Sequence, residues 1–448
     1  MTNNSQTIYA LSSGALPAAI AVVRISGPYA FKAARLLGVE SLISRKLVLT
    51  KIQPVGQEII DMALACVFPK KQSITGEDLV ELHLHGSIAV IDELFLFFSS
   101  IKELRPAEPG EFTRRSLING KMDITEVEGL ADLLASETKQ QRIHSIKLLK
   151  GELSDKYTHW RQKLIKARAE MEALLDFSDE GDVAQKTNDN EFIKNISDLI
   201  ADIEKDLVRG IAGERLRKGL KIALIGPPNV GKSSLINLLL KEDRAIVSTS
   251  AGTTRDTIEA RANLEGVPVT LYDTAGIRDT NDEIEKEGVL RSKSTAEEAD
   301  IILNIWDAST DLKEKTLDLS NNKFTRIINV YNKTDLIEEK SYINKEGFNI
   351  SCKTRQGIQG FIEGLGAEVK NLTSLSDMTV GPNRIRHINH LNETKENLGL
   401  ALKEIKTGKI DISADFLRAA SASLGRIVGS VDIEDVLDEI FLGFCIGK

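Results

Sequence analysis

The feature that most constrains this 448-residue chain is the segment 226–233, Gly-Pro-Pro-Asn-Val-Gly-Lys-Ser, which fits the phosphate-loop pattern. The apolar residues 222–225 before it predict a buried strand, and residues 235–240 after it predict a helix. In this context the glycines let backbone N–H groups approach phosphates, and the helix N-terminus favours negative charge. We therefore expect Lys232 to reach the β- and γ-phosphates of a nucleotide and Ser233 to ligate magnesium.

A second segment, Asn-Lys-Thr-Asp at 332–335, follows the strand-like residues 327–331 and carries the groups that guanine demands. The carboxylate of Asp335 accepts from both the ring N–H and the amine of guanine, whereas adenine would leave that charge unpaired. Residues 351–353 are expected to cap the other side of the base through backbone N–H groups. Taken alone, 332–335 also fits a solvated turn, but a phosphate loop in the same chain favours the guanine reader.

Between these segments an apolar strand ends at Asp273, which is placed to hold the magnesium shell, with Thr254 as the second switch ligand. Ile277 then stands where many GTPases use a glutamine to orient the attacking water. Because an aliphatic side chain cannot do this, hydrolysis needs another source of positioning and charge. The nucleotide-binding residues expected from these motifs are Asn229, Val230, Gly231, Lys232, Ser233, Ser234, Asp273, Thr274, Ala275, Gly276, Asn332, Lys333, Asp335, Ser351, Cys352 and Lys353.

The run 281–287 is rich in carboxylates, and one of them is a candidate to act on the attacking water. An exposed acidic helix start explains the same run, and composition alone favours that explanation. The choice between the two needs more than the local sequence.

Composition indicates a cytoplasmic protein. There is no run of eighteen apolar residues, and residues 1–6 lack the basic and apolar regions of a signal peptide. The three cysteines lie far apart and indicate reduced thiols instead of a disulfide framework. A net charge of −8 argues against broad nucleic-acid binding, although a local basic face would escape this count.

The chain is predicted to be a multidomain α/β protein. Residues 1–118 mix short strand-like runs with Gly and Pro, which is typical of an α+β domain. Residues 119–215 and 372–448 have helical periodicity and are expected to form one all-α domain. Residues 216–371, with a Ras-like P-loop, a parallel-type sheet and flanking helices, are then inserted into it as a G domain.

The chain closes with residues 433–440, which are apolar on one helical face, and then Phe-Cys-Ile-Gly-Lys. Cys445 is fourth from the end, but Gly447 and the final Lys448 fit a prenylation signal poorly. A buried structural cysteine is the usual explanation for such a residue.

Several further motifs give the chain a resemblance that runs from end to end. They are Arg-Ile-Ser-Gly at 24–27, Thr-Gly-Glu-Asp at 75–78, Pro-Gly-Glu-Phe-Thr at 109–113, Gly-Thr-Thr-Arg-Asp at 252–256 and the final pentapeptide. With them the chain resembles the MnmE (TrmE) family of tRNA modification GTPases. The resemblance implies an N-terminal folate-binding domain that dimerises, a potassium-dependent G domain, and an FAD-dependent partner, MnmG, with which it forms a heterotetramer.

The family's functional residues fall on matching motifs of this sequence. The resemblance implies folate binding by Arg24, Glu81, Lys121 and Lys448, and a functional role for Cys445. It places potassium at Asn229, Ser248, Ser250 and Thr253, and it makes Glu285 the residue that orients the water, against the composition argument. Residues 12–19 depart from the Pro-Pro-Gly and Gly-Gly pattern common in the family, and Cys352 replaces a small Ala beside the base.

The resulting prediction is a GTP-hydrolysing enzyme that works with GTP, Mg²⁺, K⁺ and a tetrahydrofolate derivative (5-formyl or methylene). With its FAD-dependent partner it would install an aminomethyl-type group at carbon 5 of the wobble uridine of certain tRNAs. The alternative is a regulatory or ribosome-associated GTPase switch whose flanking domains only bind partners.

Overall fold

The computed structural model describes residues 6–40, 43–176, 189–241, 259–273, 298–310, 325–337, 347–373, 379–429, 444 and 447. The chain divides into two compact units. The first contains Met1–Ala131, Leu148–Leu164 and Ser421–Lys448, and the second contains Asp132–Lys147 and Ile165–Ala420.

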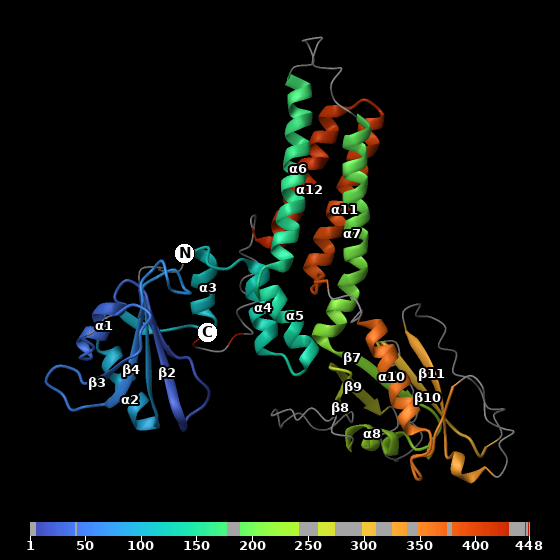
Figure 1. Cartoon of the computed structure of the whole chain (residues 1–448), viewed down its shortest axis with the longest axis horizontal. Coiled ribbons are helices and arrows are strands. Elements are labelled where there is room, and N and C mark those ends of the chain that lie inside the picture. Colours follow the sequence, from blue (N-terminus) through green and yellow to red (C-terminus); the bar gives the residue numbers. More distant parts are fainter. Residues whose placement is uncertain are drawn as a thin grey trace, which may run out of the picture. The chain divides into compact units, whose positions relative to one another are not determined.

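The first unit contains a sheet with strand order β3-β4-β5-β2-β1-β6, in which β1 and β6 are parallel and the other neighbours antiparallel (Figure 1). Its elements are β1 (Thr7–Leu11), β2 (Ala18–Ser26), α1 (Ala30–Leu36), β3 (Val48–Ile52), β4 (Asp61–Phe68), β5 (Leu79–Gly86), α2 (Ile88–Ser99), β6 (Leu104–Pro106) and α3 (Glu111–Ile118).

Side chains alternate across this sheet, and one face forms the core with α1 and α2. Along β5, Val80, Leu82 and Leu84 are buried on the helical face. The ring of Tyr9 adds aromatic packing, with its centroid 5.2 Å from Phe95 and 4.8 Å from Phe98. The opposite face carries the polar residues of β2 and β5.

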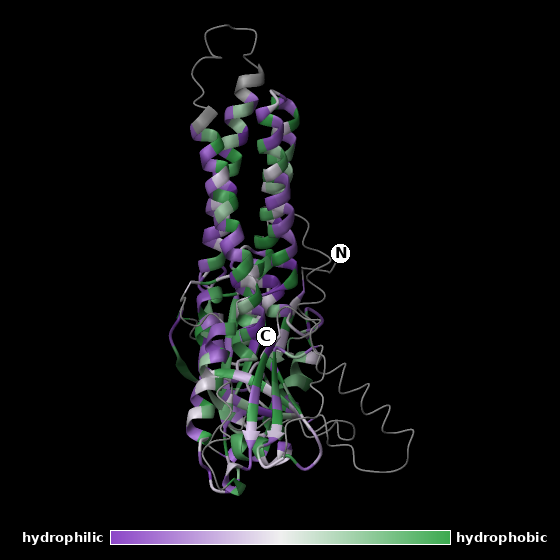
Figure 2. Ribbon diagram, turned by 90° about the vertical axis from the view of Figure 1, so that its right-hand side faces the viewer, coloured by the Kyte–Doolittle hydropathy of each residue, from purple (hydrophilic) through white to green (hydrophobic). Residues whose placement is uncertain are grey.

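The segments with helical periodicity form helices, and the longer ones carry apolar residues on one side and polar residues on the other (Figure 2). They are α4 (Ile124–Leu134), α5 (Lys139–Leu149), α6 (Glu152–Asp176), α7 (Asp189–Lys218), α11 (Ile385–Lys406) and α12 (Ile410–Val428). The helical pattern over 143–153 is split between α5 and α6, because Gly151 takes a positive φ of 81° and ends the first helix.

Within the second unit, helices that precede the second sheet (strands within 220–349) in the sequence pack against helices that follow it. α7 packs along α11. The hydroxyl of Ser413 on α12 donates to the carbonyl of Ala401 on α11 at 3.0 Å and lies 3.9 Å from the sulfur of Met171 on α6. Among the described residues, no helix combines the length and apolar character that a membrane span requires.

The second sheet has the order β12-β11-β10-β7-β9-β8, with only β8 antiparallel to its neighbour among the described strands. Its elements are β7 (Leu220–Ile225), α8 (Lys232–Lys241), β8 (Glu259–Leu264), β9 (Val267–Asp273), β10 (Ile301–Asp307), β11 (Arg326–Asn332), the 3₁₀ turn η1 (Thr334–Leu336), β12 (Phe348–Asn349) and α10 (Ile358–Leu372).

This sheet is apolar on both faces, which explains the continuous hydrophobic runs in its central strands. Ile301, Leu303 and Ile305 belong to the large core with α8 and α10, whereas Ile302 belongs to a smaller cluster with Ala223. The predicted multidomain α/β class, with a parallel-type sheet and flanking helices, is confirmed. The domain boundaries at 118/119, 215/216 and 371/372 stay predictions.

Candidate functional site

The phosphate-loop segment joins β7 to α8, as the sequence predicts, and positive φ angles bend it at Gly226 (153°), Asn229 (63°) and Gly231 (99°). A Cβ on Gly226 would collide with the carbonyl oxygen of Ile305, and one on Gly231 with the side-chain nitrogen of Asn332. Glycine is therefore required at both positions for the loop to lie against the ends of β10 and β11.

Lys232 is a buried cation at this loop, with 5% of its surface exposed. Its Nζ donates to the carbonyl oxygens of Gly226 at 2.7 Å and Pro227 at 2.8 Å. Burial lowers the pKa of Lys232, while nearby Asp273 opposes that shift. The loop thus holds the ammonium group of Lys232 where phosphates would approach. The two loop carbonyls accept hydrogen bonds from this group.

Ser233 and Asp273 form the predicted oxygen pair. The hydroxyl of Ser233, at the start of α8, donates to Oδ2 of Asp273, at the end of β9, at 2.7 Å. Asp273 is 4% exposed. A hydroxyl and a carboxylate oxygen side by side are hard ligands of the kind that Mg²⁺ takes together with substrate phosphates.

Asn332, at the end of β11, links the phosphate loop to the base segment. Its Nδ2 donates to the carbonyl of Val230 at 2.7 Å, and its Oδ1 accepts from the backbone N–H of Cys352 at 3.1 Å. Both bonds are buried or nearly so, since Asn332 is 3% exposed. Burial also raises the pKa of the Cys352 thiol, which keeps it protonated near neutral pH.

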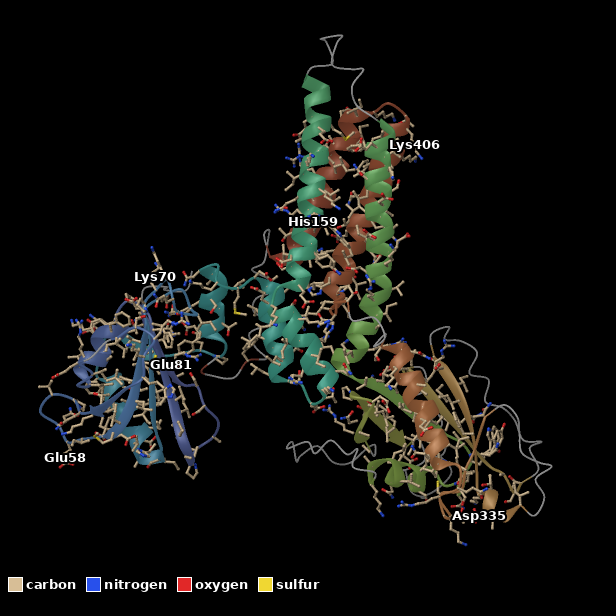
Figure 3. All side chains as sticks on the ribbon, viewed as in Figure 1. Glu58, Lys70, Glu81, His159, Asp335 and Lys406 are labelled. Atoms are coloured by element: carbon tan, nitrogen blue, oxygen red, sulfur yellow. The ribbon has the colours of Figure 1, made fainter. Side chains whose placement is uncertain are left out.

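Asp335, the predicted base reader, lies at the outer end of the second sheet's strands (Figure 3). The hydroxyl of Ser351 donates to its Oδ1 at 2.6 Å and accepts from the N–H of Thr354 at 3.1 Å. The backbone N–H of Ser351 donates to the carbonyl of Gln356 at 3.0 Å. Ser351 therefore holds the carboxylate of Asp335 through its side chain. The contact of backbone N–H groups at 351–353 with the base stays a prediction.

Asp307 is a site residue that the motifs did not identify. It ends β10, pairs in register with Asn332 of β11, and accepts from Nζ of Lys333 at 2.6 Å. Burial raises the pKa of Asp307, but hydrogen bonds from Lys333 and Ser309 outweigh it and the net shift is downward. The sequence signal for Asp307 is its position at the end of an apolar strand, which Asp273 shares.

In the first unit, Arg24 of β2 and Glu81 of β5 are cross-strand partners on the face opposite the helices. Nε and Nη2 of Arg24 donate to Oε1 of Glu81 at 3.0 and 2.8 Å. The guanidinium carbon also lies 5.7 Å from the centroid of the Phe112 ring. The pair is partly exposed, so its atoms are accessible to a ligand.

Lys121, which is also predicted at this site, has another partner among the described residues. Nζ of Lys121 donates to the carbonyl of Lys71 at 2.9 Å. Two motif residues, Glu77 and Glu111, form ion pairs with buried Arg115 at 2.8 and 2.9 Å. These ion pairs tie the Thr-Gly-Glu-Asp and Pro-Gly-Glu-Phe-Thr motifs together beneath the surface.

The C-terminal motif lies against the start of the chain at one described residue. Ser12 donates from its hydroxyl to the carbonyl of Gly447 at 2.8 Å, and a Cβ on Gly447 would collide with the carbonyl of Leu11. Phe444 packs with Ile124 and Val127 of α4. These contacts fix the segment on either side of Cys445, which is itself outside the described residues.

Several predicted site residues are outside the described residues. They are Ser248, Ser250, Thr253, Thr254, Thr274, Ala275, Gly276, Glu285, Cys445 and Lys448. Of the remaining nucleotide residues, the exposed ones are Asn229, Ser233, Ser234 and Lys353.

The ends of β7, β9, β10 and β11 meet at one edge of the parallel sheet, where a phosphate loop, an oxygen pair and a guanine-type carboxylate come together. This fold and site define a GTP-binding protein of the P-loop class. Two family models match the chain, "GTP-binding protein TrmE N-terminus" over residues 7–121 and "MnmE helical domain" over 124–445. The chain belongs to the MnmE (TrmE) family.

Curated relatives match over the whole length. The tRNA modification GTPase MnmE of Agrobacterium fabrum (strain C58) is 43% identical over 449 residues, covering 100% of both chains. The MnmE of Bradyrhizobium sp. (strain ORS 278) is 42% identical over 453 residues, again covering 100% of both. Among solved structures, Era of Aquifex aeolicus aligns with 40% of this chain and 67% of its own at 23% identity and a TM-score of 0.27, too low to add to the assignment.

Proposed function

We propose that this protein hydrolyses GTP and couples that cycle to tRNA modification at carbon 5 of the wobble uridine. The observation that carries the GTPase part is the base segment, in which Ser351 holds Asp335 and Asn332 ties the segment to the phosphate loop. The fixed carboxylate selects guanine, because it accepts from two donors that adenine does not offer together. The tRNA part rests on membership of the family.

Magnesium fits the Ser233–Asp273 oxygen pair, and Thr254 is the proposed further ligand. When bound, the ion would neutralise charge on the β- and γ-phosphates. The chain's own part is to keep Ser233 and Asp273 2.7 Å apart and to hold Lys232 beside the loop.

Potassium is proposed at Asn229 with Ser248, Ser250 and Thr253. Asn229 is exposed in a left-handed turn of the phosphate loop, so its amide oxygen is available as a hard ligand. Such an ion would supply positive charge that the aliphatic Ile277 cannot, and Glu285 would orient the water. Equal turnover in sodium and potassium would contradict this assignment.

A folate derivative is proposed at the Arg24–Glu81 pair. The chemistry of the two groups is complementary to folate, since a carboxylate accepts from the amino-pyrimidine N–H groups and cationic groups bind the glutamate carboxylates. Lys121 and Lys448 are the further residues proposed on the basis of the family resemblance. Bound folate would supply the one-carbon unit.

A homodimer is proposed through the same face of the first sheet. Leu49 of β3 and Leu64 of β4 are register partners there, with 65% and 38% of their surfaces exposed. Met62, two residues from Leu64 on the same face, is 43% exposed. Apolar strands of this kind are typical of a surface that a second copy covers. The proposed heterotetramer adds the FAD-dependent MnmG-like partner, in the cytoplasm.

The proposal is tested by mass spectrometry of wobble uridines from cells that lack the protein. Loss of the modified nucleoside, and its return with the wild-type gene but not with Lys232→Ala, is expected. Unchanged tRNA together with GTP-dependent co-sedimentation with ribosomal particles would favour the ribosome-associated switch instead. A strain with Cys445→Ser should keep GTP turnover but lose modification, and wild-type nucleoside levels would make Cys445 a structural residue.

A further inference from the structure

Three loops of the first unit meet at a surface of which the proposed function uses only Lys121. Arg45 donates its backbone N–H to Val67 at 2.9 Å, and Ser44 donates its hydroxyl to Gln72 at 2.7 Å. These bonds hold the segment 43–46 against the turn 69–73. Because Lys121 donates to the carbonyl of Lys71 at 2.9 Å, the turn 119–121 joins the same surface.

The three loops carry basic side chains and no acidic ones. Their sequences are Ile-Ser-Arg-Lys at 43–46, Pro-Lys-Lys-Gln-Ser at 69–73 and Asn-Gly-Lys at 119–121. All five basic residues, Arg45, Lys46, Lys70, Lys71 and Lys121, are exposed. We call these five residues the basic cluster.

The charges of the basic cluster are not neutralised within the described part of the chain, where its side chains form no ion pair. Two acidic residues follow the turn 69–73 in the sequence, and both have partners of their own. Asp78 accepts from the backbone N–H of Lys70 at 2.9 Å, and Glu77 is paired with buried Arg115 at 2.8 Å. Figure 3 shows the Lys70 side chain directed away from the sheet.

The loop backbone is built to present these side chains. Gln72 and Ser73 both donate to the carbonyl of Pro69, at 2.7 and 3.0 Å, which makes a tight turn with Lys70 and Lys71 at its tip. Arg45 has a positive φ of 59°, a strained choice for a residue with a Cβ. Backbone strain at an exposed cation indicates a ligand-binding position, because an ordinary surface loop does not require it.

We propose that the basic cluster contacts the phosphate backbone of tRNA. In a chain of net charge −8, five neighbouring cations that form no ion pair with the described residues are the kind of surface that a polyanion needs. Lysines on loops act as point charges, so the contact positions the RNA and does not read its sequence. The inference rests on tRNA being the substrate and does not depend on the potassium assignment, whereas Lys121 is shared with the proposed folate site.

The test compares two full-length variants that lose equal charge from the same domain. The first replaces Arg45, Lys46, Lys70 and Lys71 by Gln and keeps Lys121, which is proposed to bind folate. The control replaces the exposed residues Lys32, Arg35, Lys51 and Lys102 by Gln. Binding of fluorescently labelled tRNA is measured by anisotropy over a series of salt concentrations, with GTP turnover as the check of integrity. Binding of polyglutamylated folate is measured in parallel.

The cluster variant should bind tRNA at least about tenfold more weakly near 0.1 M salt, and its slope of log affinity against log salt should fall by about three, whereas the control should change little. Equal binding by both variants would overturn this inference alone. Loss of affinity for polyglutamylated folate with unchanged tRNA affinity would also overturn it, in favour of a folate tail. A wild-type protein that binds no tRNA would overturn it together with the tRNA part of the proposed function.

Discussion

Removing the hydroxyl of Ser351 should weaken nucleotide binding without slowing hydrolysis. The bond from this hydroxyl to Asp335 is 2.6 Å long and charge-assisted, and Ser351 is fully buried. A hydrogen bond to a charged group contributes about 1.5–3 kcal/mol. If Ser351→Ala removes that contribution from the complex, the dissociation constant for GTP should rise by about 10- to 150-fold.

The assay is stopped-flow dissociation of a fluorescent GDP analogue, together with steady-state turnover. Because Ser351 does not face the phosphates, Ser351→Ala should raise KM and the dissociation rate and leave kcat nearly unchanged. Thr373→Val is the matched control, since it removes a buried hydroxyl bond of 2.7 Å to the carbonyl of Val369 at the far end of α10. Wild-type dissociation from a folded Ser351→Ala protein would refute the role of Ser351.

Three further predictions concern the base reader, the residue proposed to orient the water, and a buried histidine. Asp335→Asn should weaken GTP and improve xanthosine triphosphate, because an amide can donate to the oxygen that replaces the guanine amine; unchanged preference in competition binding would mean that the base reader is misplaced. Glu285→Ala should slow single-turnover hydrolysis in potassium with nearly unchanged GTP affinity, and a comparable loss of binding would contradict its role. Burial, with a smaller effect of Lys147, lowers the pKa of His144 from its ordinary 6.5 to about 4, so the protein disfavours its protonation. Stability should therefore be full above pH 6.5 and fall by up to about 3 kcal/mol as the pH drops toward 4. His144→Gln should lose this dependence in denaturant titrations, exposed His159→Gln should retain it, and identical pH profiles would count against the assignment.

The nucleotide site was predictable where its signal is local. A phosphate loop needs only a strand, a glycine-rich turn and a helix in succession, and β7, residues 226–231 and α8 supply them. Ser351 and Asp307 were not identified in these roles because their partners come from another segment of the chain, with Lys333 directly after β11 and Asp335 in η1. Asp307 reaches Lys333 only through the register of β10 with β11, which no short sequence pattern encodes.

In the first unit, too, contacts between distant residues could not be predicted from short sequence patterns. Arg24 and Glu81 are 57 positions apart and meet because β2 and β5 pair in that register. Their proximity could be expected only from the family resemblance, not from composition or spacing. The burial of Arg115 also could not be predicted, because the sequence does not show that Glu77 and Glu111 lie beside it.

The side chain of Asn332 makes the two ends of a nucleotide interdependent. One amide spans from the carbonyl of Val230 to the N–H of Cys352, so a shift of either segment strains the other. A ligand that fits the base segment badly would therefore also disturb the phosphate loop. Inorganic phosphate does not contact the base segment, so it would bind a less well-ordered loop. Discrimination against wrong bases then extends to the phosphate loop, where a mismatch at the base also weakens the hold on the phosphates.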